Sequence, residues 1–129
     1  MGPLQDDWMV GILVDTCGWT SLVDSGLNLD VAFESAVGEF ELLVINEVRM
    51  ELESLEAQRR GLLLDLLDIR SKQVASKELG HTDDALVSLS KDNSWPVLTV
   101  DKGLKQKLIG RGCSYVEVTS GPSLRLVEP

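Results

Sequence analysis

The sequence predicts an α/β fold in which helices cover a mostly parallel sheet. Short, mainly apolar runs, each followed by a polar residue, recur at 11–14, 42–45 and 97–100. Such runs are typical of buried strands in a parallel sheet. Segments with helical spacing of apolar residues separate these runs. The alternation of short strands with helices indicates a layered α/β architecture.

Length and composition suit one compact domain. The chain has 129 residues, of which 43% are hydrophobic, so a single domain spanning residues 1–129 can bury a core of its own. No apolar run approaches the roughly 20 residues that a membrane span needs. The first residues lack the basic start and apolar stretch of a signal peptide. We therefore expect no membrane association and a cytoplasmic location.

The two cysteines do not indicate a metal site or a redox motif. Cys17 and Cys113 form no CxxC pair, and the chain has a single histidine, so a zinc site cannot be completed. We expect both to be small, buried thiols of a protein from a reducing compartment.

Charge is distributed unevenly along the chain. The formal net charge is −9, which argues against a general nucleic-acid coat protein, because such proteins are normally basic. Residues 102–129 nevertheless contain five basic and two acidic residues. If acidic residues elsewhere in the chain gathered to hold a metal ion, a basic C-terminal part beside them could hold a polyanion against that metal site.

The N-terminal half predicts two strands, each followed by polar residues. The run 11–14 ends at Asp15, and 15–18 is then the loop at the carboxyl end of that strand, where open α/β sheets bind ligands. Asn28 or Asp30 could cap a helix that runs to about Val37 and ends at Gly38.

The second strand, 42–45, leads into a helix. Asn46 is its plausible cap, and its apolar positions are Val48, Leu52 and Leu55, the i, i+4, i+7 stripe of an amphipathic helix. Glu51 lies within or beside this stripe, whereas Glu53 has the position of an ordinary solvated acid. The pattern breaks at 58–61, residues 62–67 begin another helix, and 73–75 form a weak strand or a loop.

The C-terminal half predicts a third strand between two helices. Thr82 can cap a helix that begins at Asp83, with Leu86 and Leu89 facing inward. After a turn at 95–96, the strand 97–100 ends at Asp101. A basic helix with Leu104 and Leu108 on its inner face closes at the glycines 110 and 112. Alternating polarity over 114–118 predicts an edge strand, and 119–122 form a loop before a short tail.

Four acids have positions that could converge. Asp15 and Asp101 follow strands, Glu51 flanks a helix, and Asp83 begins one. Each also has an ordinary interpretation. Asp15 could cap its loop, Asp101 could be an N-cap, Glu51 could be a solvated boundary residue, and Asp83 with Asp84 could complement a helix dipole. Together they would form a hard-oxygen ligand set for a divalent metal, because Mg²⁺ and Mn²⁺ prefer such ligands.

The same segments resemble a known family. Residues 12–16 (ILVDT), 48–52 (VRMEL), 82–86 (TDDAL) and 98–104 (LTVDKGL) are similar to the ordered motifs of PIN-domain nucleases. The resemblance extends from about Val10 to Leu126. It is strongest to small single-domain PIN proteins related to the nuclease that processes small-subunit ribosomal RNA. PIN toxins of toxin–antitoxin pairs are the alternative subfamily.

The resemblance implies a three-layer α/β/α fold and hydrolysis of single-stranded RNA, with an rRNA precursor as one candidate substrate. It implies that the carboxylates hold Mg²⁺ or Mn²⁺ and that two threonines support them by hydrogen bonding. The metal-site acids would be Asp15, Glu51, Asp83 and Asp101, with Asp84 the alternative to Asp83, and the supporting residues Thr16 and Thr99. Cys17 departs from the family pattern, which often has Asn there.

Partners follow from the charge pattern and from the resemblance. Backbone phosphates of RNA could be held by the basic residues Lys102, Lys105, Lys107 and Arg111, although a basic helix is often only a solvated face. The apolar segment 62–67 predicts a homodimer or higher oligomer. An antitoxin partner applies only to the toxin alternative, and a non-catalytic module that binds RNA or protein is a further alternative. A phosphotransfer domain is not favoured, because residues 15–17 supply neither paired acids nor an Asp-x-Asp motif.

Overall fold

Strands and helices alternate along the chain in the computed structural model, which describes residues 9–59, 62–75, 81–120 and 123–129. In chain order the elements are β1 (Val10–Val14), α1 (Thr16–Ser25), α2 (Leu29–Val37), β2 (Phe40–Ile45), α3 (Asn46–Arg59), α4 (Leu62–Arg70), β3 (Ser71–Val74), α5 (Thr82–Asn93), β4 (Val97–Leu98), α6 (Lys102–Gly110), β5 (Tyr115–Thr119) and β6 (Ser123–Val127).

The strands form one sheet with the order β3-β2-β1-β4-β5-β6. All neighbours are parallel except β5 and β6, which are antiparallel. From β1 the chain moves outward to β2 and β3 and later returns to place β4 on the other side of β1. The mostly parallel α/β sheet predicted from the sequence is therefore confirmed.

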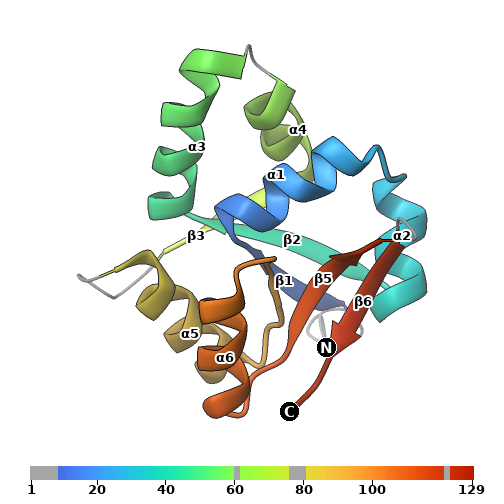
Figure 1. Cartoon of the computed structure of the whole chain (residues 1–129), viewed down its shortest axis with the longest axis vertical. Coiled ribbons are helices and arrows are strands. Elements are labelled where there is room, and N and C mark those ends of the chain that lie inside the picture. The colour runs from blue at the N-terminus through green and yellow to red at the C-terminus, as the bar shows by residue number, and fades with distance from the viewer. Residues whose placement is uncertain (1–8, 60–61, 76–80, 121–122) are drawn as a thin grey trace, which may run out of the picture.

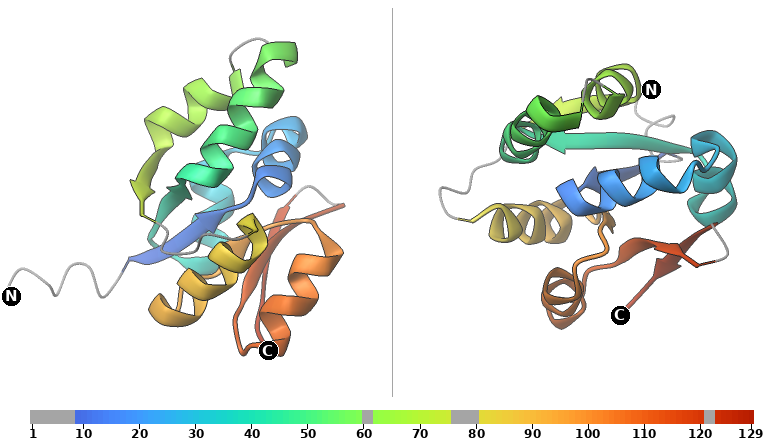
Figure 2. Two further views of the ribbon diagram at one scale, coloured as in Figure 1. Left: turned by 90° about the vertical axis from the view of Figure 1, so that its left-hand side faces the viewer. Right: turned by 45° about the horizontal axis from the view of Figure 1, so that its top comes forward.

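Helices lie on both sides of the strands. Helices α1, α3 and α4 contact one another, and α5 contacts α6. Figure 1 shows the first group above the strands and the α5–α6 pair below them. Both views of Figure 2 likewise show α3 beside α4 and, away from them, α5 beside α6. Right-handed crossovers place the helices in this way, because the chain runs outward from β1 in opposite directions in its two halves. The molecule thus has three layers.

The core explains why the apolar runs become strands. Residues 12–14 of β1 are fully buried, and residues 42–45 of β2 are nearly so, as expected when helices cover both faces of a parallel sheet. Trp19 of α1 and Phe33 of α2 are the largest fully buried side chains. Phe33 also stacks on Phe40, with ring centroids 4.7 Å apart. Trp19 and Phe33 thus belong to the hydrophobic core, against which Phe40 packs.

Several local predictions are wrong at the level of single elements. Residues 16–18 are the first turn of helix α1, not a loop. Strand β4 ends at Leu98, two residues earlier than expected, and Asp101 is instead the N-cap of α6. Strand β5 lies inside the sheet, and the edge is formed by β6, where a short tail was expected. Thr82 is the first residue of α5 and not its cap, which is His81.

The apolar segment 62–67 is at least partly covered by this chain. Leu67 is fully buried, Leu66 packs against the core, and Ile69, further along α4, is 77% exposed. The core therefore accounts for part of the apolar character that motivated the expectation of an oligomer, which stays a prediction. Within the described residues, no helix is long and apolar enough to cross a membrane.

Gly18 lets α1 approach β4 closely. A Cβ atom added at Gly18 would lie 2.3 Å from the Leu98 carbonyl oxygen, so Gly18→Ala should lower the free energy of unfolding by about 1–3 kcal/mol through overpacking. Gly110→Ala is the matched control in α6, because nothing lies within 4 Å of its added Cβ, and alanine favours helices by up to about 1 kcal/mol. Urea unfolding of both variants tests this contact. Equal stabilities would show that α1 does not pack as closely as described.

Candidate active site

The carboxyl ends of β1 and β4 meet where the strand order reverses. The backbone N–H of Asp15 donates to the Leu98 carbonyl over 3.0 Å, so the residues that follow the two strands are held side by side. Ligands of open α/β sheets bind at such a switch point. A pocket of about 640 Å³ opens there and is lined by Asp15, Thr16, Cys17, Thr20, Ser21, Asp24, Glu51, Leu55, Asp83 and Asp101. We call it the acid pocket.

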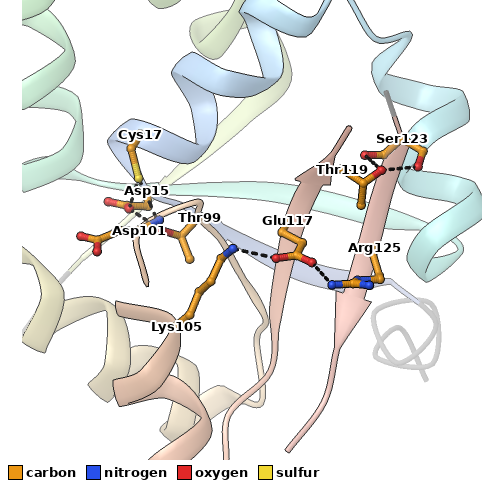
Figure 3. Close-up of polar contacts among 9 residues, drawn as sticks. All are labelled: Asp15, Cys17, Thr99, Asp101, Lys105, Glu117, Thr119, Ser123 and Arg125. Carbon is orange, nitrogen blue, oxygen red and sulfur yellow. Dashed lines mark hydrogen bonds and ion pairs between the residues drawn. The ribbon is translucent and has the colours of Figure 1, made fainter. Parts of the chain in front are cut away.

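Asp15 is the most buried of these acids, with 6% of its surface exposed. It is the N-cap of α1, and its Oδ1 accepts the Thr16 backbone N–H over 2.9 Å. Its Oδ2 accepts the Thr99 hydroxyl over 2.8 Å and the Cys17 thiol over 3.0 Å, as Figure 3 shows. A carboxylate oxygen accepts about two hydrogen bonds. Oδ2 is therefore saturated, and Oδ1 keeps one acceptor position for a ligand.

Cys17 is a hydrogen-bond donor in this pocket. Its Sγ also lies 3.5 Å from the Thr99 hydroxyl oxygen. Burial, and then the hydrogen bond to Asp15, raises the pKa of the Cys17 thiol. The thiol therefore keeps its proton at neutral pH and can donate it to the carboxylate. The residue that departs from the family pattern thus still contacts Asp15.

Asp101 is held by backbone hydrogen bonds. Its Oδ1 accepts the Gly103 N–H over 2.8 Å, which caps α6. Its own N–H donates to the Thr99 hydroxyl oxygen over 3.1 Å. Thr99 is fully buried and, since its hydroxyl proton goes to Asp15, it connects the two acids. The N-cap interpretation of Asp101 is correct, and the cap position also places Asp101 at the acid pocket.

Two threonine hydroxyls hold Glu51 from different helices. Thr16 donates to Glu51 Oε1 over 2.5 Å, and Thr82 donates to Oε2 over 2.7 Å. Glu51 is exposed, while Val48 and Leu52 of the same helix are fully buried. Glu51 therefore extends from the edge of the buried stripe and joins the starts of α1 and α5 to α3.

Asp83, in the first turn of α5, is affected electrostatically by Asp15, Asp101 and Glu51. Burial, and then the charge of Asp15, raises the pKa of Asp83, and Asp101 and Glu51 add to the increase. Lys107 opposes it, with its Nζ 3.9 Å from Asp83 Oδ2. Like charges that are held together favour the protonated form. The charges of Asp15, Asp101 and Glu51 therefore reach Asp83 across the acid pocket.

Helix α6 is anchored to the sheet by a buried carboxylate. Glu117 of β5 is 9% exposed and accepts a hydrogen bond from Lys105 over 2.6 Å and another from Arg125. Figure 3 shows these two side chains reaching Glu117 from opposite sides. These bonds, Lys105 first, lower the pKa of Glu117. Because Asp101 is the N-cap of α6, the same anchor helps to fix the position of Asp101 in the pocket.

The structure separates other candidate residues from the pocket. Asp84 is exposed and lines a different groove, so Asp83 is the member of the pair that faces the other acids. Lys105 is engaged by Glu117 and lies over the Tyr115 ring, and Lys102 is exposed. Thr16 and Thr99 both bond to acids of the pocket.

Sequence reasoning missed several residues of this neighbourhood, among them Asp24, which also lines the acid pocket. Thr82 has the sequence context of a helix cap, and only the fold shows that its hydroxyl binds Glu51. Cys17 had no motif that marked it as a donor to Asp15. Glu117 sits in an alternating strand, where a lone acid normally indicates a solvent-facing position. A charge on the inner face of β5 could be found only from the strand order.

The acid pocket offers the type of ligand atom, carboxylate oxygen, that a hard divalent cation needs. Across the described part of the chain, no three or more His, Cys, Asp or Glu side chains lie, as they stand, in a group that could hold a metal ion. Five carboxylates nevertheless line the acid pocket, namely the predicted Asp15, Glu51, Asp83 and Asp101 and in addition Asp24. Asp15 Oδ1 also has acceptor capacity left. Carboxylate oxygens are the ligands that Mg²⁺ and Mn²⁺ prefer. A cation there would also offset the repulsion that raises the pKa of Asp83.

Thr99 should be essential for the rigidity of this pocket. In Thr99→Val, Asp15 loses a donor and the Asp101 N–H loses its acceptor, with little change in side-chain shape. We expect the free energy of unfolding to fall by about 1–3 kcal/mol. Thr20→Val is the control, because the Thr20 hydroxyl only donates to the Thr16 carbonyl within α1. Urea denaturation compares the two, and a similar small loss in both would show that Thr99 does not connect the acids.

Comparison with known proteins agrees with this geometry at the level of the fold. No protein-family model matches the chain, and no curated protein matches it. Among solved structures, its fold is that of the PIN domain. One similar structure is that of the PIN domain endonuclease Utp24, with a TM-score of 0.79, 20% sequence identity and coverage of 92% of each chain. The PIN-like fold expected from the sequence motifs is therefore confirmed.

Proposed function

We propose that this protein is a metal-dependent endoribonuclease that hydrolyses phosphodiester bonds of single-stranded RNA. The observation that supports this most strongly is the acid pocket, where carboxylates from four separate parts of a PIN-like fold come together. Burial and the charges of Asp15, Asp101 and Glu51 raise the pKa of Asp83, so keeping Asp83 ionised in this pocket costs stability. Groups perturbed in this way are typical of functional sites.

In this proposal Asp15, Glu51, Asp83 and Asp101 hold Mg²⁺ or Mn²⁺. The bound cation would supply Lewis acidity to the scissile phosphate and to the attacking water. The rest of the pocket keeps the acids oriented. Thr99 and Cys17 fix one oxygen of Asp15, the hydroxyls of Thr16 and Thr82 fix Glu51, and the helix cap fixes Asp101. Removing such a supporting hydrogen-bond partner typically lowers metal affinity or activity by about 10–100-fold.

The finer assignments rest on the sequence motifs. Their resemblance to rRNA-processing PIN proteins leads us to propose an rRNA precursor as the substrate. A cytoplasmic location and a homodimer complete the proposal. Light scattering at high micromolar concentration tests the homodimer, and a monomer there would contradict it.

Cleavage of a labelled single-stranded RNA tests the proposed activity. We expect internal cleavage in Mn²⁺ or Mg²⁺, none in EDTA, and loss of most activity in Asp101→Asn. Asparagine is also a good N-cap, so this variant removes the charge while keeping the start of α6. Glu53→Gln is the control, because the Glu53 side chain is 53% exposed and faces Arg49 outside the pocket. Unchanged cleavage in EDTA would contradict the proposal.

A further inference from the structure

A second groove lies along the contact between α5 and α6. It has a volume of about 520 Å³ and is lined by Asp84, Val87, Ser88, Lys107, Gly110 and Arg111. A Cβ atom added at Gly110 would meet nothing within 4 Å, so the groove is open at this point of α6. Its lining combines two cations, a hydroxyl and one acid. We call it the α5–α6 groove.

Among the basic residues of α6 and its C-cap, one is neutralised by an ion pair and two line the groove. Lys105 faces the sheet, where Glu117 neutralises it. Lys107 and Arg111, four residues apart, line the α5–α6 groove. Arg111 is exposed, and its guanidinium forms no ion pair with any residue that the structure describes. Its five N–H donors are suited to a phosphate.

The groove adjoins the acid pocket. Asp83 lines the acid pocket and its neighbour Asp84 lines the groove. Lys107 stands between the two sites, with its Nζ 3.9 Å from Asp83 Oδ2 and its side chain 54% exposed. At the other end, Lys91 of α5 donates to the Arg111 carbonyl over 3.1 Å. Cations therefore follow the α5–α6 contact outward from the acids.

A negatively charged protein needs such a path to bind RNA. With a net charge of −9, the molecule repels a polyanion at long range, and the acid pocket adds to that repulsion. Local cations must hold the backbone, because phosphate contacts supply most of the sequence-independent affinity for nucleic acids. The negative charge of Asp84 in the groove repels phosphate, so removing this charge should strengthen RNA binding.

We propose that the α5–α6 groove binds a backbone phosphate of the RNA strand next to the nucleotide that enters the acid pocket. Lys107 and Arg111 contact the phosphate oxygens, and Ser88 adds a hydroxyl donor. This proposal rests on the proposed ribonuclease function. It states where the RNA strand runs on the protein surface: from the acid pocket along the contact between α5 and α6.

Binding of a fluorescein-labelled single-stranded RNA, followed by anisotropy in EDTA over a series of salt concentrations, tests the groove. Arg111→Gln is the decisive variant, because Arg111 does not touch the acid pocket. We expect about tenfold weaker binding and a salt dependence reduced by about 0.7 in its logarithmic slope, the value for one phosphate contact to a single strand. Asp84→Asn should bind more tightly than the wild type.

Lys72→Gln is the charge-matched control, since Lys72 lies on edge strand β3 with its side chain 70% exposed. Equal weakening in Lys72→Gln and Arg111→Gln would overturn the proposal, because only diffuse charge would then matter. Absence of RNA binding by the wild type would also overturn it. If the wild type cleaves RNA in Mn²⁺ while Arg111→Gln binds RNA with wild-type affinity, the proposal that the groove binds phosphate is wrong and the ribonuclease function stands. If Arg111→Gln weakens RNA binding but the wild type does not cleave RNA, the groove is supported and the ribonuclease function is contradicted.

Discussion

Asp15→Asn should reduce RNA cleavage by at least about 100-fold while the protein remains folded. A loss of this size is the upper end for residues that only support a metal site, and Asp15 is proposed to be a ligand itself. Asparagine keeps the side-chain oxygen that caps α1, so helix formation is preserved. The measured quantities are the initial rate of cleavage in Mn²⁺ and the far-ultraviolet circular dichroism.

Glu53→Gln again provides the comparison, because it removes a carboxylate from α3 outside the acid pocket. Its cleavage rate should stay close to that of the wild type. If Asp15→Asn and Glu53→Gln lost activity equally, or if Asp15→Asn lost activity only through unfolding, Asp15 would be a structural cap and the acid pocket would be assigned wrongly.

Asp83→Asn should stabilise the metal-free protein at neutral pH and weaken its stabilisation by Mn²⁺. The folded state raises the pKa of Asp83 above its usual value of 3.8. As pH rises through the range between the unfolded and folded pKa values, the folded state holds more protons than the unfolded state, so stability falls. At neutral pH this penalty is complete, and asparagine removes it. The gain should therefore be present at neutral pH and absent below about pH 3.8.

Thermal unfolding in EDTA and in Mn²⁺, at neutral and acidic pH, measures both effects. In the wild type, Mn²⁺ at about 100 times its dissociation constant adds about 2.7 kcal/mol, and Asp83→Asn should gain less. Asp84→Asn makes the same change in the same helical turn but outside the acid pocket, so its Mn²⁺ gain should match the wild type. A destabilised Asp83→Asn with the full Mn²⁺ gain would remove Asp83 from the metal site.

The strands of this fold could be predicted from sequence because burial on both faces makes them apolar without interruption. This holds for β1 and β2, whose inner residues are nearly all buried. It fails for β6, whose residues alternate between buried and exposed because it lies at the edge of the sheet. Helix α1 was missed because it begins with polar residues and a glycine at 16–18, a pattern typical of a loop. That glycine is required by the close approach to β4.

Four acids of the pocket could be proposed from sequence, because Asp15 and Asp101 follow apolar runs, Asp83 begins a helix and Glu51 lies beside an apolar stripe. Of their supporting partners, Thr16 and Thr99 could be proposed from the resemblance to PIN motifs, whereas the specific hydrogen bonds they make, and the roles of Thr82 and Cys17, could not. Thr99 bonds to Asp15 and Thr82 to Glu51, and only the strand order brings these pairs together. The choice between Asp83 and Asp84 likewise depends on which side of α5 faces the pocket, and helical spacing alone does not determine that.

The most direct test of the metal-site proposal is diffraction from crystals of the protein soaked in Mn²⁺. Anomalous difference maps locate manganese independently of any activity. We expect a peak in the acid pocket, in contact with Asp15 and at least one of Glu51, Asp83 and Asp101. A map without a peak there, at Mn²⁺ concentrations that support cleavage, would contradict the proposal that these carboxylates form a metal-dependent nuclease site.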